Sequence, residues 1–307
     1  MPRIFAIGET VYDIIFKDGI PVASTPGGSM LNTAVSLGRL GQNVYFISEY
    51  ANDTVGKLID TFLQSNGVKT DYASRFDNYP SSLALAFLDN NNNAEYSFYK
   101  QYPDIRLDID FPELKSDDIV IYGSFYGIEP VIYKRLKPFL EHAHSQNALV
   151  VYDPNFRKAH LSQLDIYHPI MMNNFAHADI VKGSDEDFRY IFSTETAIET
   201  WKKLEKSCDM LIYTANKNDV ELCMSSVSES YSVPPISPVS AIGAGDTFNA
   251  GLIYGLMNQK IGKKQLKMMS KKQRADIIKC SIEFAGHVCL SYENYLSIDF
   301  VEKKRLS

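Results

Sequence analysis

The chain contains 307 residues, of which 31 are Lys or Arg and 37 are Asp or Glu, so its net charge is −6. A hydrophobic fraction of 45% is ordinary for a folded protein and excludes a disordered chain, a fibre and a small disulfide scaffold. The acidic balance argues against a dedicated nucleic-acid binder, which is usually basic. This length fits either one large α/β domain or two smaller domains.

Two absences predict a cytoplasmic protein that binds no membrane. No segment approaches the roughly 18 consecutive apolar residues that span a bilayer, and the first acid, Glu9, comes too early for a secretory signal peptide. The cysteines show no CxxC spacing, which in a chain this long indicates reduced thiols rather than bridges. They are Cys208, Cys223, Cys280 and Cys289.

Short apolar runs alternate with amphipathic stretches along the chain. The runs predicted as buried strands are 4–7, 44–47, 119–122, 149–152, 179–181 and 210–213. Leu31, Ala34 and Val35 share one helical face, and a second helix is predicted over 130–146 with Pro130 in its first turn. Strands that alternate with helices indicate βαβ units, so we expect an α/β fold: a mainly parallel sheet flanked by helices on both faces.

One region interrupts this alternation. Residues 83–88 and 94–99 are predicted as two strands joined by an asparagine-rich turn at 90–93, since asparagine tolerates positive φ. A second hairpin is predicted at 220–233. Because antiparallel hairpins inserted in an α/β chain often form a flap, we expect a small β-hairpin lid. Its strands are expected from about 10–25 and 80–105.

A basic run follows near the carboxyl end. Residues 258–274 carry six lysines and Arg274 without one acid. Such a run is either an anion-binding patch or a solvated helix and loop surface, and charge runs usually lie in water. We therefore expect a solvated surface here.

The segment most informative about chemistry reads Ile-Gly-Ala-Gly-Asp-Thr-Phe from residue 242. Gly243 and Gly245 at a helix start let the backbone approach a ligand. The N–H groups of Ala244 and Gly245, together with the helix dipole, suit a phosphate or a developing oxyanion. Asp246 is either an N-terminal cap without chemistry or the base that takes a proton from an attacking hydroxyl. We predict that Gly243 to Asp246 form the catalytic turn.

Other phosphate-binding and metal-binding motifs are missing from the sequence. The GxxxxGK(S/T) string of P-loop proteins does not occur, and Gly243 lacks the later glycine of a dinucleotide fingerprint. That fingerprint belongs on the first βα turn, where only Gly8 is present, so an NAD-dependent oxidoreductase is disfavoured. The six histidines show no metal-ligand spacing, so no metal is assigned to them.

Several strings occur in one order along nearly the whole chain. They are Gly8-Glu9 with Asp13, the segment 26–34 that begins Pro-Gly-Gly, Asp153-Pro154-Asn155-Phe156-Arg157, and Gly243 to Asp246. Together they resemble the ribokinase-like sugar kinases, also called the phosphofructokinase-B family, and most closely the fructokinase branch. The resemblance implies the ribokinase-like fold and phosphoryl transfer to a sugar.

This resemblance implies a role for each matching residue at the sugar. The implied sugar contacts are Asp13, Gly27, Gly28 and Asn32. The residue types suit that role, since a carboxylate accepts hydrogen bonds from two hydroxyls and an amide both donates and accepts. Glycines let the sugar approach the backbone. Arg157 offers a planar fork for a phosphate or a substrate carboxylate.

The resemblance also implies ATP and magnesium. The implied nucleotide contacts are Lys182, Ser184, Thr214 and Asn216, and Asp187 is the implied magnesium residue, acting through water. Two strings depart from the family pattern. Ser240-Ala241-Ile242 replaces the residues that supply a monovalent-cation site in many relatives, so potassium activation is not expected. Asn216 and Asp219 replace the two glycines of the nucleotide turn, and both residue types tolerate left-handed conformations.

The implied function is an ATP-dependent sugar kinase that transfers the γ-phosphate to a primary hydroxyl, with fructose as the first choice. The alternatives are 2-keto-3-deoxygluconate, whose carboxylate suits Arg157, then ribose or a nucleoside, and a non-catalytic sugar-binding regulator of the same fold. The sugar residues lie early in the chain and the base lies at Asp246, so we expect one kinase domain over 1–307. Its expected partners are the sugar, ATP and a second copy that pairs through the lid.

Overall fold

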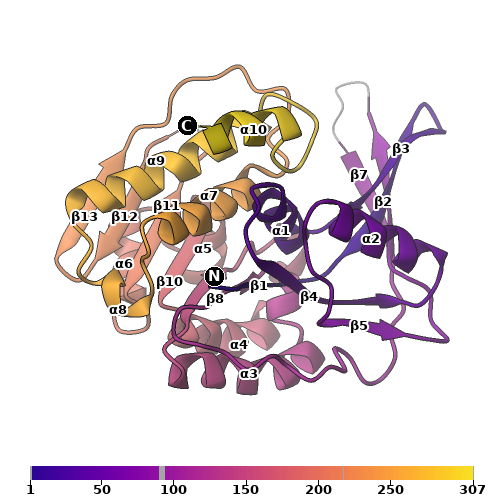
Figure 1. Cartoon of the computed structure of the whole chain (residues 1–307), viewed down its shortest axis with the longest axis horizontal. Helices are drawn as coiled ribbons and strands as arrows, with labels where there is room; N and C mark the ends of the chain where they lie inside the picture. The colour runs from indigo at the N-terminus through magenta and orange to yellow at the C-terminus, as the bar shows by residue number, and fades with distance from the viewer. Residues whose placement is uncertain (1, 90–93, 217, 307) are drawn as a thin grey trace.

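A computed structural model of the chain describes residues 2–89, 94–216 and 218–306. A nine-stranded sheet runs through its centre (Figure 1). From one edge to the other its strands are β5 (Ala73–Phe76), β4 (Val44–Ala51), β1 (Ile4–Ile7), β8 (Ile119–Gly123), β9 (Leu149–Asp153), β10 (Ile180–Ser184), β11 (Met210–Thr214), β12 (Val220–Met224) and β13 (Val227–Tyr231). The strands from β5 to β11 are parallel, and β12 and β13 complete the sheet as an antiparallel hairpin.

All six strands predicted from apolar runs are present. The clearest extension is β4, which continues beyond residue 47 through Ser48 and Glu49 although both are polar. Glu49 is buried, and its carboxylate accepts hydrogen bonds from Arg106 Nε at 2.6 Å and from the Leu107 backbone N–H at 2.8 Å. Those donors satisfy the carboxylate, so a strand can carry it inside the protein.

Helices cover both faces of this sheet, as predicted (Figure 1). One face packs on α1 (Ser29–Arg39), α2 (Thr54–Ser65), α7 (Ala244–Asn258) and α9 (Lys271–Val288), and the other on α3 (Pro130–Ser145), α4 (Leu164–His177), α5 (Asp185–Phe192) and α6 (Ala197–Leu204). The remaining helices are α8 (Lys263–Leu266), α10 (Ile298–Leu306) and two 3-10 turns, Phe125–Gly127 and Lys158–Gln163. Along β1, Ile4 and Ala6 join the first core, whereas Phe5 and Ile7 join the second. The alternation of side chains in a strand produces these two cores.

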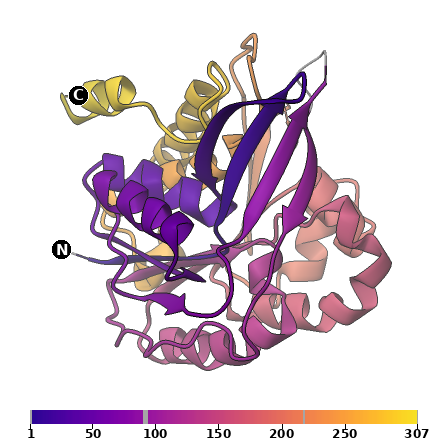
Figure 2. The ribbon, with the colours of Figure 1, turned by 90° about the vertical axis from the view of Figure 1, so that its right-hand side faces the viewer.

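A second, four-stranded sheet has the order β3-β2-β6-β7 and rises beside the helices (Figure 2). Its strands are β2 (Val11–Lys17), β3 (Ile20–Gly27), β6 (Leu83–Leu88) and β7 (Ala94–Tyr99). The predicted hairpin at 83–88 and 94–99 is confirmed, while its turn at 90–93 lies outside the described residues. The other predicted hairpin, at 220–233, is also present, but it extends the edge of the large sheet.

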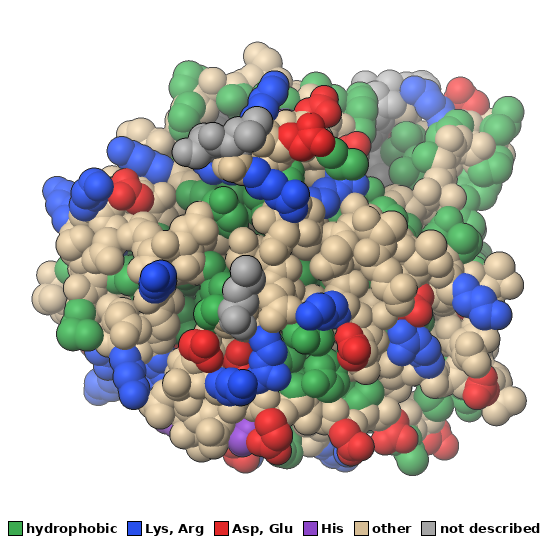
Figure 3. Space-filling view, viewed as in Figure 1, with side chains coloured by type: hydrophobic (Ala, Val, Ile, Leu, Met, Phe, Trp, Pro, Cys, Tyr) green, Lys and Arg blue, Asp and Glu red, His purple; other side chains and the backbone are tan. Residues whose placement is uncertain are grey.

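The basic run at 258–274 is largely engaged by acids of the same chain. Lys263 pairs with Asp179 at 2.8 Å, and Lys267 pairs with Asp209 at 2.9 Å. Arg274 pairs with Glu229 at 2.7 Å. On the face seen in Figure 3, basic side chains are spread among acidic ones rather than gathered in one patch. These pairs favour an ordinary folded surface over an anion-binding patch.

The cysteines agree with the expectation of reduced thiols. All four cysteines are free thiols, and burial raises the pKa of the Cys208 thiol to about 12. Within residues 2–89, 94–216 and 218–306, no helix combines the length and apolar character that crossing a membrane requires.

Close packing of α7 on α9 depends on Gly251. A Cβ at this position would lie 2.6 Å from Ser281 Cα, so we expect Gly251→Ala to lower the free energy of unfolding by about 1–3 kcal/mol. Gly286 of α9 is the matched control, because no described atom lies within 4 Å of its Cβ position. There alanine should add up to about 1 kcal/mol through helix propensity. Urea denaturation measures both changes, and equal shifts for the two variants would contradict this packing argument.

Candidate active site

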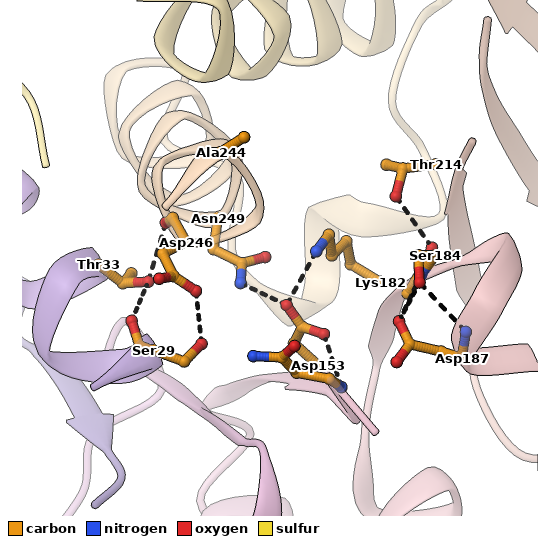
Figure 4. A network of polar contacts seen from close by, with 12 residues as sticks. Ser29, Thr33, Asp153, Lys182, Ser184, Asp187, Thr214, Ala244, Asp246 and Asn249 are labelled. Carbon is orange, nitrogen blue, oxygen red and sulfur yellow. Dashed lines mark hydrogen bonds and ion pairs between the residues drawn. The ribbon is translucent and has the colours of Figure 1, made fainter. Parts of the chain in front are cut away.

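The amino ends of α1 and α7 meet at the carboxylate of Asp246 (Figure 4). Ser29 Oγ donates to one carboxylate oxygen at 2.6 Å, and Asn32 Nδ2 donates to the other at 2.8 Å. Thr33 Oγ1 donates to the Asp246 backbone carbonyl at 2.9 Å. The side chain is thus fixed in one orientation by the first two turns of a helix from the other end of the chain.

Glycines make both helix starts possible. Gly243 precedes α7 with φ 80°, and a Cβ there would lie 2.6 Å from the Asn294 carbonyl oxygen. Gly28 precedes α1 with φ 140°, and a Cβ there would lie 2.3 Å from the Glu9 carbonyl oxygen. Any other residue would be strained and would push the helix starts away from these neighbours.

The surroundings of Asp246 favour a proton acceptor. Burial raises the pKa of its carboxyl above the ordinary value, while the hydrogen bonds from Ser29 and Asn32 act in the opposite direction. The charge of Asp153 adds to the increase, and that of Lys182 opposes it. A carboxylate with a raised pKa is a stronger general base than an exposed one.

A second polar cluster lies where β9 and β10 end (Figure 4). Lys182 Nζ pairs with Asp153 Oδ2 at 2.9 Å, and Asn249 Nδ2 of α7 donates to the same oxygen at 2.7 Å. All three residues are buried. A Cβ on Gly245 would lie 3.2 Å from Lys182 Nζ, so the ammonium lies directly beside the first turn of α7.

Asp187 forms a capping box with Ser184 at the start of α5. Ser184 Oγ and its backbone N–H donate to Asp187 Oδ2 at 2.6 and 2.7 Å, and the Phe156 backbone N–H donates to Oδ1 at 2.6 Å. Burial raises the pKa of this carboxyl, and the charge of Asp153 adds to the increase. Both oxygens are therefore used inside the protein, which favours a structural role for Asp187 over the predicted contact with magnesium.

The small sheet contributes the residues expected at the sugar. Asp13 lies within β2, inside the segment of about 10–25 from which a lid strand was expected. Burial raises the pKa of its carboxyl to about 7, and among the described residues this side chain has no hydrogen-bond partner. Gly27 packs against it, since a Cβ there would lie 2.1 Å from Asp13 Oδ2.

Comparison with known proteins identifies the family. Residues 1–281 match the sequence profile described as pfkB family carbohydrate kinase. The chain belongs to the pfkB family of carbohydrate kinases. Fructokinase from Escherichia coli is 25% identical over 276 residues, which cover 87% of this chain and 88% of the relative. Probable fructokinase-4 from Arabidopsis thaliana is 25% identical over 265 residues, which cover 82% of this chain and 79% of the relative.

Solved structures share the fold of this pfkB-family kinase. A fructokinase from Vibrio cholerae, solved with fructose, ADP and a calcium ion, has a TM-score of 0.83 at 18% identity, covering 99% of this chain and 98% of that one. An aminoimidazole riboside kinase from Salmonella enterica has a TM-score of 0.82 at 16% identity, covering 98% of this chain and 99% of that one. These likenesses confirm the predicted ribokinase-like fold.

The structure brings most of the predicted kinase residues into two groups. The first joins Asn32 and Gly28 with Gly243 to Asp246, and the second places Lys182 and Ser184 beside Asp187. Thr214 lies next to the second group, and its Oγ1 donates to the Gly183 carbonyl at 3.3 Å (Figure 4).

Two predicted residues lie on loops around these groups. Asn216 has φ 52°, the left-handed conformation expected where it replaces a glycine, whereas Asp219 does not adopt a positive φ. Arg157 is exposed and has no ion pair among the described residues. It lies close enough to Tyr96 of β7 to lower the pKa of that hydroxyl, which burial and the charge of Asp13 raise. The charges of Arg157 and Asp13 therefore both act on Tyr96.

Four residues of the site were not predicted individually. Ser29, Thr33 and Asp153 lie within strings that resemble the family, but only their partners in the fold show what they do. Asn249 lies in the same helix as Asp246, three residues later, and this spacing places both on neighbouring parts of one helix surface. That spacing was the one signal available in the sequence.

Asp13 gives a test of this geometry that needs no substrate. Its folded-state pKa of about 7 exceeds the unfolded value, so between about pH 4 and pH 7 the folded chain holds a proton that the unfolded chain has lost. Stability therefore falls as pH rises through this window, with a slope of at most about 1.4 kcal/mol per pH unit. Asp13→Asn should remove this slope in urea titrations. An unchanged pH dependence in the variant would show that Asp13 does not hold the proton.

Proposed function

We propose that this pfkB-family kinase transfers the γ-phosphate of ATP to a primary hydroxyl of a small sugar, with fructose as the first candidate. The observation that carries the proposal is the Asp246 carboxylate, held by Ser29 and Asn32 at the meeting point of two helix amino ends. Fructokinases among the curated relatives and the Vibrio cholerae structure with fructose and ADP support the choice of sugar.

Asp246 would accept the proton of the sugar hydroxyl as its oxygen attacks the γ-phosphorus, while the bond from phosphorus to the ADP oxygen breaks. Negative charge on the transferred group would be stabilised by the amino end of α7. The Gly245 N–H has no partner among the described residues and is free for this role. The Ala244 N–H already donates to the Ala241 carbonyl at 3.3 Å, so Gly245 is the stronger candidate of the two.

The sugar would lie between Asp246 and the small sheet. Asn32 Nδ2 binds Asp246, but its buried Oδ1 has no partner among the described residues, which suits a hydroxyl donor from a substrate. The Asp13 carboxylate, which has no partner among the described residues, offers a second acceptor, and Gly27 leaves it room by having no side chain. Gly28, which is partly exposed, would let the sugar approach the backbone. Arg157 would contact the far end of the substrate.

A sugar acid is the second candidate. Arg157 has no acidic partner among the described residues, so it is available for a substrate carboxylate such as that of 2-keto-3-deoxygluconate. A relative 27% identical over 250 residues is named 5-dehydro-2-deoxygluconokinase, from Clostridium botulinum, and it covers 76% of this chain. A nucleoside or ribose is third, with the Salmonella enterica aminoimidazole riboside kinase as the structural relative.

We propose ATP as the phosphoryl donor, lying over the carboxyl ends of β10 and β11 near Lys182, Ser184, Thr214 and Asn216. A fructokinase from Xylella fastidiosa with the same fold was solved with bound ATP, at a TM-score of 0.81. Magnesium would enter with the nucleotide. The described residues include no group of three or more His, Cys, Asp or Glu side chains that fits a metal ion, so no step here is assigned to it.

Two further expectations concern the small sheet and the cation. We propose that the small sheet is the lid of a single kinase domain and that two copies pair through it. Large apolar side chains exposed on the small sheet support this pairing; they are Ile20, Val22, Phe87, Tyr96, Phe98 and Tyr99. Figure 3 shows apolar side chains gathered over this part of the molecule. We also propose activity without potassium, since Ser240, Ala241 and Ile242 offer no carboxylate.

Replacing the base gives the most direct test of mechanism. Asp246→Asn should lower kcat by about 10²–10⁴-fold, because the amide cannot take the proton, while the hydrogen bond from Ser29 is retained. Steady-state ADP release measures kcat, and urea denaturation checks the fold. Asp299→Asn is the matched control, since Asp299 also lies in a first helical turn but is exposed on α10. Near-normal turnover of Asp246→Asn would remove Asp246 as the base.

The sugar is tested by ADP release across fructose, 2-keto-3-deoxygluconate, ribose and a nucleoside. We expect the highest kcat/KM with fructose. If the sugar acid is preferred, Arg157→Met should lower kcat/KM for that substrate by at least tenfold and leave fructose little changed. Sugar binding without ADP release from any of the four would contradict the proposed phosphoryl transfer and favour a binding role.

A further inference from the structure

Lys182 is a buried cation whose only ion pair in the described part of the chain is with Asp153. The exposed fractions of the two side chains are 6% and 2%, and the Nζ–Oδ2 distance is 2.9 Å. Burying two charges is costly, so such a pair is poor evidence of a purely stabilising role. An ammonium has three N–H donors, and Asp153 uses one of them.

The remaining donors of Lys182 lie beside Gly245. Apart from Gly245, its chain neighbours and the nearby backbone of α7, Nζ is the only described atom within 4 Å of the Cβ position of Gly245, at 3.2 Å. Gly245 itself is exposed, and its backbone N–H has no partner among the described residues. The exposed N–H of Gly245 therefore lies beside a largely buried ammonium, and one anionic group bound at the first turn of α7 would be close to both.

The Asp153 carboxylate is itself fixed from three directions. Lys182 of β10 and Asn249 of α7 both bind Oδ2, and the Asn155 backbone N–H donates to Oδ1 at 3.1 Å. Asn249 is fully buried and its distance to Oδ2 is 2.7 Å. This carboxylate thus ties the ends of two strands to the helix that carries Gly245 and Asp246.

We propose that Asp153 and Asn249 are positioning residues that hold the Lys182 ammonium beneath Gly245, where it binds a phosphate of the nucleotide. The inference rests on the proposed kinase function and extends it, because it gives a positioning role to two residues that do not themselves contact the substrate. Lys182 contacts the phosphate. Asp153 fixes the position of the Lys182 ammonium and keeps that ammonium charged. Asn249 fixes Asp153 relative to α7.

The charges around Lys182 support this arrangement. Burial alone disfavours the ammonium, but Asp153 of β9, Asp187 of α5 and Asp246 of α7 outweigh it and raise the pKa of Lys182. Asp153 is the largest of these contributions. If the charge of Asp153 is removed, less remains to oppose the effect of burial on the pKa of Lys182. The ammonium should then lose its proton at a lower pH.

The test compares ADP with adenosine, which lacks the phosphates, by titration calorimetry at pH 7 and pH 9.5. For Asp153→Asn we expect at least a tenfold weaker affinity for ADP, an unchanged affinity for adenosine, and a larger loss at pH 9.5. Asp118→Asn is the matched control. Asp118 is equally buried and pairs with Arg3, but it precedes β8 at the amino ends of the parallel strands, whereas Asp153 lies at the carboxyl end of β9, so ADP affinity should not change.

A second variant keeps the test decisive if Asp153→Asn does not fold. Asp153→Asn combined with Lys182→Met leaves no unpaired charge, and it should weaken ADP binding by a similar factor at both pH values. The proposal is overturned if either variant binds ADP like the wild type, or if adenosine and ADP lose affinity equally. Turnover is read separately: a wild type that binds ADP but phosphorylates no sugar refutes the proposed function, not the role of Asp153.

Discussion

The candidate site depends on the convergence of two helix amino ends at one carboxylate. Asp246 of α7 accepts hydrogen bonds from Ser29 and Asn32 of α1, which lie 217 and 214 residues away in the chain. Each helix end presents unsatisfied N–H groups and the positive end of its dipole. A chain of net charge −6 thereby directs two positive helix ends to one place, which is where the proposed phosphoryl transfer requires them.

A second set of polar contacts ties the small sheet to the large one. Lys100, just after β7, pairs with Glu9 at 2.7 Å, and the Tyr102 hydroxyl donates to the same carboxylate at 2.7 Å. A few residues later Arg106 pairs with the buried Glu49 of β4. Because Glu9 follows β1 directly, these contacts hold the segment leaving the small sheet at the carboxyl edge of the parallel strands, beside α1.

Elements whose stability is local could be predicted from the sequence, and those that depend on distant partners could not. Continuous apolar runs predicted the parallel strands of the large sheet except β5, whose Ser74 and Arg75 interrupt any apolar run, and β1 matches its run at both ends. The extension of β4 through Glu49 was missed, because a carboxylate is expected at the surface until Arg106, 57 residues later, is known to satisfy it. Asn249 was missed for the same reason, since its partner Asp153 is 96 residues away.

The residues proposed for phosphoryl transfer and those proposed for sugar binding lie on different parts of the fold. Asp246 and Asn249 lie on one turn of α7, so the proposed proton acceptor and the proposed support for Lys182 are fixed relative to each other by a rigid helix rather than by loops. Asp13 and Gly27 belong instead to the small sheet. If the proposed function holds, changes in β2, β3 or Arg157 alter which sugar is bound while Asp246 and Asn249 keep their positions on α7.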